Sequence, residues 1–555
     1  MADKADESTI SGDKLTDSGE ETKKGCEPGG GDAALILATD SFEDLSYETF
    51  DSEGIKRHPS GTISRIAREV SVDESLENVP AGSAEPEETP TKADAIKNDS
   101  DDKSEDSISQ SSASENTGVQ DAIDNDRSSV SEIPEEEEEE PGENVQSAEW
   151  KNKDMHIFIF SDAGKPIYSR YGKEDKLVTI MGVMQALVSF IQDSKDNMRC
   201  IIAGDHQFVF LVREHIILVC VSKTTESTTQ IMLRLTYVYN QIISVLTYSQ
   251  LSRIFKTRRN YDLRRLLSGT EKFIDNLLNL MDHDPSFLLG AVRCLPLPNS
   301  IRETIAQTVT MHAKVKDLVF AILLANNQLV TLVRMKKYFL HPIDLHLIIN
   351  LVNASESFKA AESWTPICLP KFDTSGYLHG HVSYLDDECN SCLLLLTVDR
   401  DTFFKLSDCR NRILDRLKRH NCLQAINESL KRKGYSTTQV GIPDLRHFMY
   451  KSRSTAQFTS PDFEAPYISD EEQTRLYGLY QYLHHRIHCT ARPLKILFHV
   501  GEYETLLGWV TSGFELYAIF GPLTTKPVAI ASVNRLLKWI KKEEDRLFIL
   551  NSPTF

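Results

Sequence analysis

Met155-His-Ile-Phe-Ile-Phe160 is an apolar run, and Pro166-Ile-Tyr-Ser-Arg-Tyr171 follows it after a short turn at Asp162-Ala-Gly-Lys165. Two such runs around an Asp- and Gly-containing turn predict a β-hairpin. Apolar residues then recur at spacings of three and four, which predicts one buried face of a helix that Asp175 caps. The residues of this face are Leu177, Ile180, Met181, Met184, Leu187, Val188 and Ile191. Three apolar runs between residues 200 and 221 predict strands, and a second helix follows over residues 231–246.

The same order of elements returns twice along the chain. In the second copy, a hairpin over residues 318–333 precedes a helix that Pro342 opens, since proline suits the first helical position. Three strands between residues 365 and 398 and a helix from residue 403 complete this copy. The third copy begins with a hairpin over residues 445–458, whose Ser and Thr content weakens the alternation, and it ends with a helix that Pro527 opens.

Each copy therefore predicts a small α+β module. Strands joined by short turns pair antiparallel, and helices that return to one sheet cover its faces. We expect three modules, each an antiparallel five-stranded sheet flanked by helices, after a long disordered acidic N-terminal tail. The predicted boundaries are 1–149 for the tail, 150–282 for the first module, 283–314 for a helical linker, 315–433 for the second module and 434–555 for the third.

The first 150 residues differ from the rest in charge. They hold 12 Lys plus Arg and 41 Asp plus Glu, a net charge of −29, a composition typical of a disordered segment. The whole chain holds 62 Lys plus Arg and 81 Asp plus Glu. Residues 151–555 therefore hold 50 basic and 40 acidic residues, a net charge of +10. These opposite charges allow the tail to lie across the body and inhibit it. The alternative is that the acidic run Glu135 to Glu140 only solvates a linker.

No segment of the chain has the composition of a membrane span. The longest apolar run, Leu318 to Leu324, is far shorter than the roughly 20 residues that cross a bilayer. The polar start Met1-Ala-Asp-Lys-Ala-Asp is unlike a signal peptide. Ten Cys without a disulfide-like spacing indicate a reducing compartment. We therefore expect a soluble, cytoplasmic protein whose membrane contact is peripheral.

Catalytic motifs are missing from the chain, which has no phosphate-binding Gly-rich loop, dinucleotide fingerprint, nucleophile elbow or His-Glu-x-x-His helix. Two sets of residues are candidates for a metal site: His379, His381, Cys389 and Cys392, and His484, His485 and His488. The first set lacks a second Cys-x-x-Cys pair. In the second set only residues 484 and 488 share a face of the predicted helix, so a third metal ligand is missing. We interpret both as packed or solvated side chains, and we expect no enzyme activity, no metal and no cofactor.

Two basic groups stand out in the body. They are Lys256, Arg258, Arg259, Arg264 and Arg265 in the first module, and Arg416, Lys418, Arg419, Lys431, Arg432 and Lys433 in the second. Clustered cations fit phosphoinositide head groups or acidic proteins, and the alternative is an ordinary solvated helix face. Few aromatic residues accompany these cations, so we expect no nucleic-acid partner.

Several motifs resemble the vacuolar fusion protein Mon-one family. They are Met155-His-Ile-Phe-Ile-Phe160, Gly164-Lys-Pro-Ile-Tyr-Ser-Arg-Tyr-Gly172, Gly182-Val-Met-Gln-Ala-Leu187 and the C-terminal Trp539-Ile-x-x-Glu543. The resemblance covers residues 150–555 and implies three longin-type modules in the order given above. The N-terminal tail resembles the family only in being long and acidic.

The resemblance implies a function as well as a fold. Members of this family pair with Ccz-one, a second three-longin protein, as a guanine-nucleotide exchange factor for the late-endosomal Rab GTPase, Rab-seven. The early-endosomal Rab, Rab-five, and phosphatidylinositol 3-phosphate recruit the complex, which drives endosome conversion, vacuole or lysosome fusion and autophagosome maturation. We expect the same partners here, with room for a further scaffold subunit, and a peripheral location on endosomal, lysosomal or vacuolar and autophagosomal membranes.

The resemblance also indicates where partners bind. The positions expected to contact the late-endosomal Rab and the partner lie in the first module and are Ser169, Arg170, Tyr171, Gly172, Gly182, Gln185 and Ala186. In the second module, Trp364 precedes a predicted edge strand and is the expected contact for the upstream Rab, with a buried core Trp as the alternative. The lipid-binding candidates are Lys256, Arg258, Arg259, Arg264, Arg265, Lys431, Arg432 and Lys433.

Two other classes of protein remain open. A longin-type trafficking adaptor would share the fold and bind a Rab without accelerating nucleotide release. A small-molecule enzyme would need a convergent acid, base or metal set, for which the residues around Cys389 are the one candidate.

Overall fold

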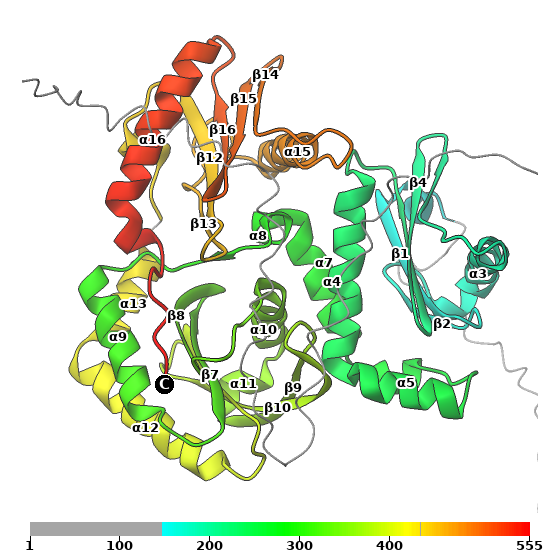
Figure 1. Ribbon diagram of the computed structural model, residues 1–555, viewed down its shortest axis with the longest axis horizontal. Helices are drawn as coiled ribbons and strands as arrows, with labels where there is room; N and C mark the ends of the chain where they lie inside the picture. Colours follow the sequence, from blue (N-terminus) through cyan, green and yellow to red (C-terminus); the bar gives the residue numbers. More distant parts are fainter. Residues whose placement is uncertain (1–146, 433) are drawn as a thin grey trace, which may run out of the picture. The chain divides into compact units, whose positions relative to one another are not determined.

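The computed structural model describes residues 147–432 and 434–555. The predicted tail up to residue 146 and the lipid-binding candidate Lys433 lie outside these residues. Three β-sheets with flanking helices follow one another along the described chain, which confirms the expected α+β fold of three modules (Figure 1). None of the described helices is both long and apolar enough to cross a membrane.

The first module has a five-stranded antiparallel sheet in the order β2-β1-β5-β4-β3. Its strands are β1 (Met155–Ser161), β2 (Pro166–Ser169), β3 (Cys200–Ala203), β4 (His206–Arg213) and β5 (Ile216–Ser222). Helix α3 (Val178–Asp193) covers one face. The other face carries α4 (Thr228–Leu246), α5 (Tyr248–Thr257), α6 (Arg264–Leu267) and α7 (Glu271–His283). The short helices α2 (Ala148–Asn152) and η2 (Glu174–Leu177) precede β1 and α3.

The apolar run of β1 is continuous because both faces of this sheet are covered. Successive side chains of a strand point to opposite faces. Ile157 and Ile159 accordingly pack with α4, whereas Phe158 and Phe160 pack with α3.

The second module repeats this arrangement with the order β8-β7-β11-β10-β9. Its strands are β7 (Leu318–Ala325), β8 (Gln328–Arg334), β9 (Ser363–Leu369), β10 (Asp373–Tyr384) and β11 (Ser391–Thr397). One face carries α10 (Pro342–Ala354) and α11 (Ser357–Ala360), and the other carries α9 (Asn299–His312), α12 (Phe403–Arg419) and α13 (Cys422–Lys431). Pro342 stands in the first turn of α10, as predicted.

The third module differs from the five-stranded expectation by one strand, since its order is β14-β15-β16-β12-β13-β6. The strands are β12 (Leu445–Ser452), β13 (Gln457–Thr459), β14 (Ile496–Val500), β15 (Thr505–Val510), β16 (Phe514–Phe520) and β6 (Val292–Arg293). Helices α15 (Asp470–Ile487) and α16 (Lys526–Leu547) cover its two faces. The remaining short helices are α8 (Pro285–Leu289) and α14 (Thr437–Val440).

The sixth strand, β6, comes from the predicted helical linker. It pairs parallel with β13, and the adjacent Cys294 bridges to Leu329 of the second sheet. The linker takes this extended path because Ala291 and Val292 are buried and the Val292 amide donates to the carbonyl of Ala456 at 3.0 Å. This segment therefore touches two sheets, which its sequence alone does not indicate.

The prediction that Asp175 caps α3 is wrong. The helix begins at Val178, after the turn of η2, and no side chain caps its first N–H groups. Asp175 instead pairs with Arg264, with 2.8 Å between Oδ1 and Nη1. The carboxylate therefore ties the start of α3 to the segment at α6.

Helix α4 joins the first module to the other two. Tyr237 meets His346 of α10, with 2.9 Å between its hydroxyl and Nδ1, and both side chains are buried. Asn350 Nδ2 donates to Gln241 Oε1 at 2.8 Å. Because unpaired polar groups are costly inside a protein, these side chains specify the contact between α4 and α10.

Buried neutral histidines predict that the third module is sensitive to acid. Burial lowers the pKa of His447 from 6.5 to about 3. The unfolded chain therefore binds this proton first, and the free energy of unfolding falls as the pH drops below about 6.5. Between pH 7 and pH 5 the loss from this residue is about 2 kcal/mol. We expect His447→Gln to reduce the pH dependence of urea unfolding over this range, with His420→Gln, at an exposed histidine, as the matched control. An undiminished pH dependence would contradict this account.

Candidate interaction surfaces

The predicted residues Ser169 to Gly172 lie at the end of the β1–β2 hairpin, on the edge of the first sheet. Ser169 is buried, and its hydroxyl donates to the carbonyl of Tyr171 at 2.7 Å. The Trp150 indole donates to the same carbonyl at 3.1 Å. Gly172 has a φ of 84°, a conformation that favours glycine. The hairpin end is thus held rigidly, with the partly exposed Tyr171 ring beside Arg170.

Arg170 is engaged inside the chain rather than free at the surface. Its guanidinium pairs with Asp282 at 2.6 Å, and its side chain is 9% exposed. Asp282 also binds Arg234 at 2.6 Å, and Arg234 binds Glu226 at 2.8 Å. Glu226 in turn accepts from Gln481 Nε2 of α15 at 2.9 Å. This charged chain, named here the Arg234 network, joins the hairpin end to the third module.

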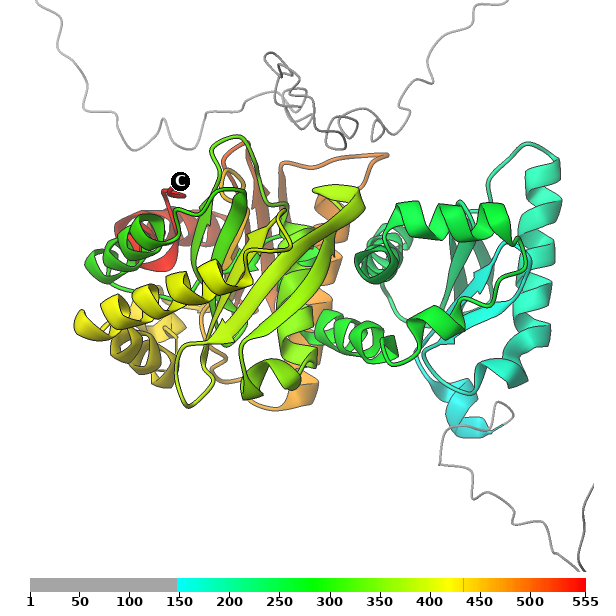
Figure 2. The same ribbon diagram turned by 90° about the horizontal axis from the view of Figure 1, so that it is seen from below.

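Helix α3 carries two apolar faces. Met181, Met184 and Val188 are buried against the sheet. A second row, Val183, Leu187 and Phe190, is exposed to solvent, and Phe190 is 73% exposed. Figure 2 shows α3 on the side of the first sheet away from α4 and α5. The prediction that Leu187 belongs to the buried face is therefore wrong, because only one of the two apolar faces can meet the sheet.

The other three predicted positions of α3 flank this exposed row. Ala186 is exposed, and the space around Gly182 is open, since an added Cβ would meet no atom within 4 Å. Gln185 holds the hairpin turn, because its Nε2 donates to the carbonyl of Asp162 at 3.1 Å. The outward side of α3 therefore combines small residues with large apolar ones, which suits close approach of another chain. We define the α3 face as Val183, Ala186, Leu187 and Phe190.

Strand β3 forms the other edge of the first sheet. Within the described part of the chain it pairs with β4 alone. Ile202 on this strand is strongly exposed. An edge strand of this kind offers free backbone groups and an apolar side chain to a second protein.

Trp364 lies at the edge of the second sheet, as predicted, but within β9 rather than before it. Its ring is half-buried, stacks on His379 with centroids 5.7 Å apart, and meets Phe403 of α12 edge-on at 5.8 Å. The neighbouring Phe404 is 80% exposed. Trp364 is thus part of an aromatic group that is open to solvent. It is neither a fully exposed side chain nor a buried core tryptophan.

Among the described residues, the basic groups divide into cations without an ion pair and cations that are paired. Lys256, Arg258, Arg259 and Arg265 are exposed around the end of α5, beside the partly exposed Leu266. Arg264 is engaged by Asp175 and Asp262. In the second module, Lys431 and Arg432 are exposed and make only long contacts with Glu388 and Glu428, at 3.9 and 3.6 Å. The α5 group therefore offers the denser set of available charges.

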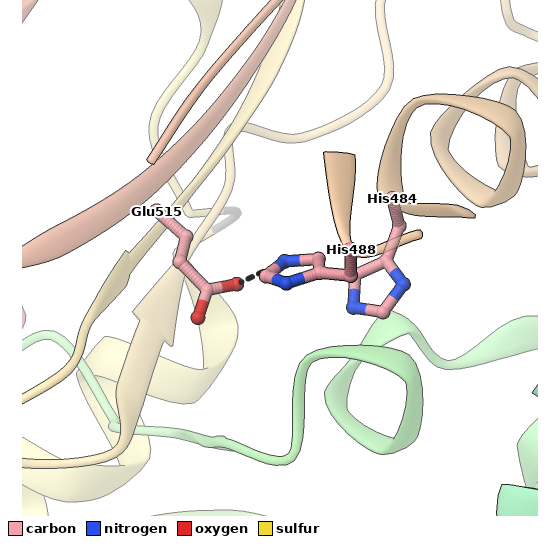
Figure 3. Close-up of side chains that lie close together, drawn as sticks. All are labelled: His484, His488 and Glu515. Atoms are coloured by element: carbon pink, nitrogen blue, oxygen red, sulfur yellow. Dashed lines mark ion pairs between the residues drawn. The ribbon is translucent and has the colours of Figure 1, made fainter. Parts of the chain in front are cut away.

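The histidines of α15 acquire a third neighbour, Glu515 of β16 (Figure 3). His488 Nε2 lies 3.4 Å from Glu515 Oε2. Lys451 Nζ and Arg453 Nε lie 3.0 and 3.7 Å from the other carboxylate oxygen. Two fixed cations beside the one anionic ligand disfavour a divalent ion. We interpret this group as an ion-pair network.

The pKa values in this group agree with that interpretation. Burial raises the pKa of Glu515, but the hydrogen bond to His488 and the charge of Lys451 outweigh it and bring the pKa well below its usual range. Burial lowers the pKa of His484 to about 3, so this ring is neutral. The other metal candidates do not gather into one set of ligand atoms within the described residues, since His381 binds Glu362 at 2.9 Å and His379 stacks on Trp364.

Comparison with known proteins settles the family. The chain matches the first longin domain of FUZ, MON1 and HPS1 over residues 155–277, the second over 316–415 and the third over 444–544. It is 54% identical over 413 residues to vacuolar fusion protein MON1 homolog A of Gallus gallus, which covers 74% of this chain and 75% of that protein. This chain belongs to the longin family of FUZ, MON1 and HPS1.

Other members of the FUZ, MON1 and HPS1 family are similar over the same length. MON1 homolog A of Homo sapiens is 52% identical over 426 residues, which is 77% of this chain and 65% of the human protein. MON1 homolog B of Homo sapiens is 43% identical over 427 residues, or 73% and 78% of the two chains. The resemblance to the Mon-one family is therefore confirmed.

Sequence reasoning named Ala186 as a contact position but missed the exposed apolar row of the α3 face, which is Val183, Leu187 and Phe190. The stretch from Val178 to Gln192 contains no charged residue. Its polar residues are uncharged, so the helix lacks the charged outer face that is usual for a surface helix. This helix lies on one face of the first sheet, and its second apolar row stays exposed in the described part of the chain.

Proposed function

We propose that this chain is one subunit of a heteromeric guanine-nucleotide exchange factor that activates the late-endosomal Rab GTPase, Rab-seven, together with a Ccz-one-type longin protein. Membership in the family and the names of the relatives, which are vacuolar fusion proteins, support a role at vacuolar or endosomal membranes. The observation that carries the proposal is the α3 face, an apolar row that a partner longin module would cover. In this role the complex drives endosome conversion, lysosome or vacuole fusion and autophagosome maturation.

An exchange factor needs no covalent chemistry. It binds the nucleotide-free GTPase more tightly than the loaded one and displaces the switch segments that hold the phosphates and magnesium. What it needs is a rigid surface, and the first module supplies one through the braced hairpin end and α3. Tyr171 at the hairpin end and Gly182 and Ala186 on α3 are the predicted positions that remain open to such a contact.

The competing proposal, a trafficking adaptor, differs in which form of the Rab it prefers. We would measure binding of the purified two-chain complex to the late-endosomal Rab in its nucleotide-free, GDP-loaded and GTP-loaded forms. The exchange-factor proposal expects the nucleotide-free form to bind tightest. Tightest binding of the GTP-loaded form would favour the adaptor. The same measurement after removal of residues 1–149 tests inhibition by the tail, which would appear as tighter binding.

Recruitment by the upstream Rab is assigned to the aromatic group around Trp364. A central aromatic residue of an interface commonly contributes 2 kcal/mol or more, or roughly 30-fold in affinity. We expect Trp364→Ala to weaken binding of the GTP-loaded early-endosomal Rab at least tenfold in a calorimetric titration. Phe404→Ala, at a mostly exposed side chain that the fold does not need, should weaken it as well. Wild-type affinity in both variants would refute this assignment.

Membrane binding is assigned to the exposed cations at the end of α5. Each such cation contributes about 1 kcal/mol near an anionic bilayer. We expect Lys256→Glu, Arg258→Glu and Arg259→Glu together to lower binding to vesicles containing phosphatidylinositol 3-phosphate at least tenfold in a flotation assay. A control with the same change in net charge is Lys526→Glu, Lys541→Glu and Lys542→Glu on α16. Equal losses in the two triple variants would show that only the net charge matters.

A further inference from the structure

Five large apolar side chains are exposed at one end of the third sheet. Two lie in the loop before α15, two at the β14–β15 turn and one in the loop before α16: Phe463, Ile468, Val500, Tyr503 and Leu523. We call these five residues the end patch. Leu523 is 94% exposed and Ile468 is 72% exposed. Single exposed apolar residues are ordinary, but five on adjoining loops are not.

Contacts among the three loops and the neighbouring strands β12 and β15 hold the end patch together. Arg446 donates to the carbonyl of Tyr503 at 3.0 Å, and Thr505 Oγ1 donates to the carbonyl of Pro522 at 3.3 Å. The Tyr467 hydroxyl donates to Glu504 at 3.3 Å. Figure 1 shows the β14–β15 turn and the start of α16 at the same end of the module.

The loops are also braced by buried charge. Glu504 is 4% exposed and binds Arg475 at 2.6 Å and Arg446 at 3.5 Å. The Arg475 guanidinium lies 5.9 Å from the centre of the Tyr503 ring. Both arginines are therefore engaged within the module, and the loops carry their apolar side chains on a preformed support. Such preorganisation lowers the entropy cost of binding.

The exposed charges around the end patch are mainly acidic. Asp444, Asp470, Glu471 and Glu502 are exposed on the same loops or at their borders, and Lys526 is the exposed cation near Leu523. An acidic rim is repelled by an anionic bilayer and by the acidic N-terminal segment of this chain. It attracts a protein surface that carries lysine and arginine.

We propose that the end patch docks a partner protein that presents apolar side chains surrounded by basic ones. An apolar centre with a charged rim is the usual composition of a specific protein interface. This surface lies on the third module and is separate from the α3 face, the Trp364 group and the α5 cations. The proposal therefore holds whether or not the chain is an exchange factor.

The test begins with the photo-crosslinking residue p-benzoyl-phenylalanine at position 523 of the full chain, with position 541 of α16 as the control. A protein that crosslinks at 523 and not at 541 is identified by mass spectrometry and purified. Its affinity is then measured for the wild-type chain, for Leu523→Asp and for the rim reversal Asp444→Lys with Glu502→Lys. We expect at least tenfold weaker binding for both variants, and a weakening of wild-type binding by salt.

Three results would overturn the proposal. The first is the absence of a crosslink specific to position 523. The second is an affinity that stays within twofold of wild type in Leu523→Asp, whose exposed position leaves the fold intact. The third is binding that is insensitive to the rim reversal. Loss of binding to phosphatidylserine vesicles in Leu523→Asp, with protein binding unchanged, would assign the end patch to a membrane and also contradict it.

Discussion

We expect a chain carrying Leu187→Asp and Phe190→Asp to lose pairing with the proposed longin partner and, with it, the proposed nucleotide exchange. Each side chain contributes roughly 1.5–3 kcal/mol when buried in an interface, and each aspartate adds the cost of a desolvated charge. The affinity between the two subunits should therefore fall by at least about 100-fold. Analytical ultracentrifugation of the two purified chains measures this loss directly.

The control for this change is Met311→Asp on α9, which places one such charge on another exposed apolar side chain. It should leave pairing and exchange unchanged. Circular dichroism should show that both variants fold, because the exposed row of α3 makes no contribution to the core under this helix. Pairing that survives in the double variant would remove the α3 face from the interface.

Removing the Arg234 side chain destabilises the first module. Arg234→Met leaves Glu226, which is 8% exposed, and Asp282 without their shared cation. Breaking a buried ion pair by deleting one partner costs about 3–5 kcal/mol, because a buried charge is left uncompensated. We expect a loss of this size in the free energy of unfolding, measured by urea denaturation, together with faster hydrogen exchange in the β1–β2 hairpin.

Two further variants distinguish the loss of stability caused by breaking the Arg234 network from a general effect of removing an arginine. Arg264→Met removes a partly exposed ion pair with Asp175 and should cost less than about 1 kcal/mol. Adding Glu226→Gln to Arg234→Met removes the carboxylate that is left without a cation, since Asp282 still pairs with Arg170, and should restore part of the stability. If Arg234→Met costs no more than Arg264→Met, the Arg234 network does not hold the hairpin end in place.

The sequence predicts the elements of this fold well because their signals are local. The β1–β2 hairpin, α10 after Pro342 and the three-strand runs all follow from neighbouring residues. The exposure of Leu187 does not follow from neighbouring residues. The spacing of apolar residues does not determine which of the two apolar faces of α3 packs on the sheet. Strand β6 is missed for a related reason, because two residues carry no periodicity and gain their partner only through β13.

The candidate sites are harder to predict because their side chains are paired over long distances in sequence. From the sequence, Arg170 is expected to be a surface cation available to a partner. In the structure it binds Asp282, which lies 112 residues later in the chain. His484 and His488 lie together at the end of α15, as expected, but Glu515 comes from β16, Lys451 from β12 and Arg453 from the turn after β12. Trp364 was correctly placed at a sheet edge, whereas its stacking on His379 depends on the register between β9 and β10.

The central claim is that this chain catalyses nucleotide exchange only as part of a pair. Its most direct test is the rate at which a fluorescent guanine nucleotide leaves the late-endosomal Rab in the presence of this chain, of its longin partner, or of both. The account predicts acceleration by both chains together and none by either alone. An unchanged release rate with the assembled pair, while the pair still binds the Rab, would contradict it.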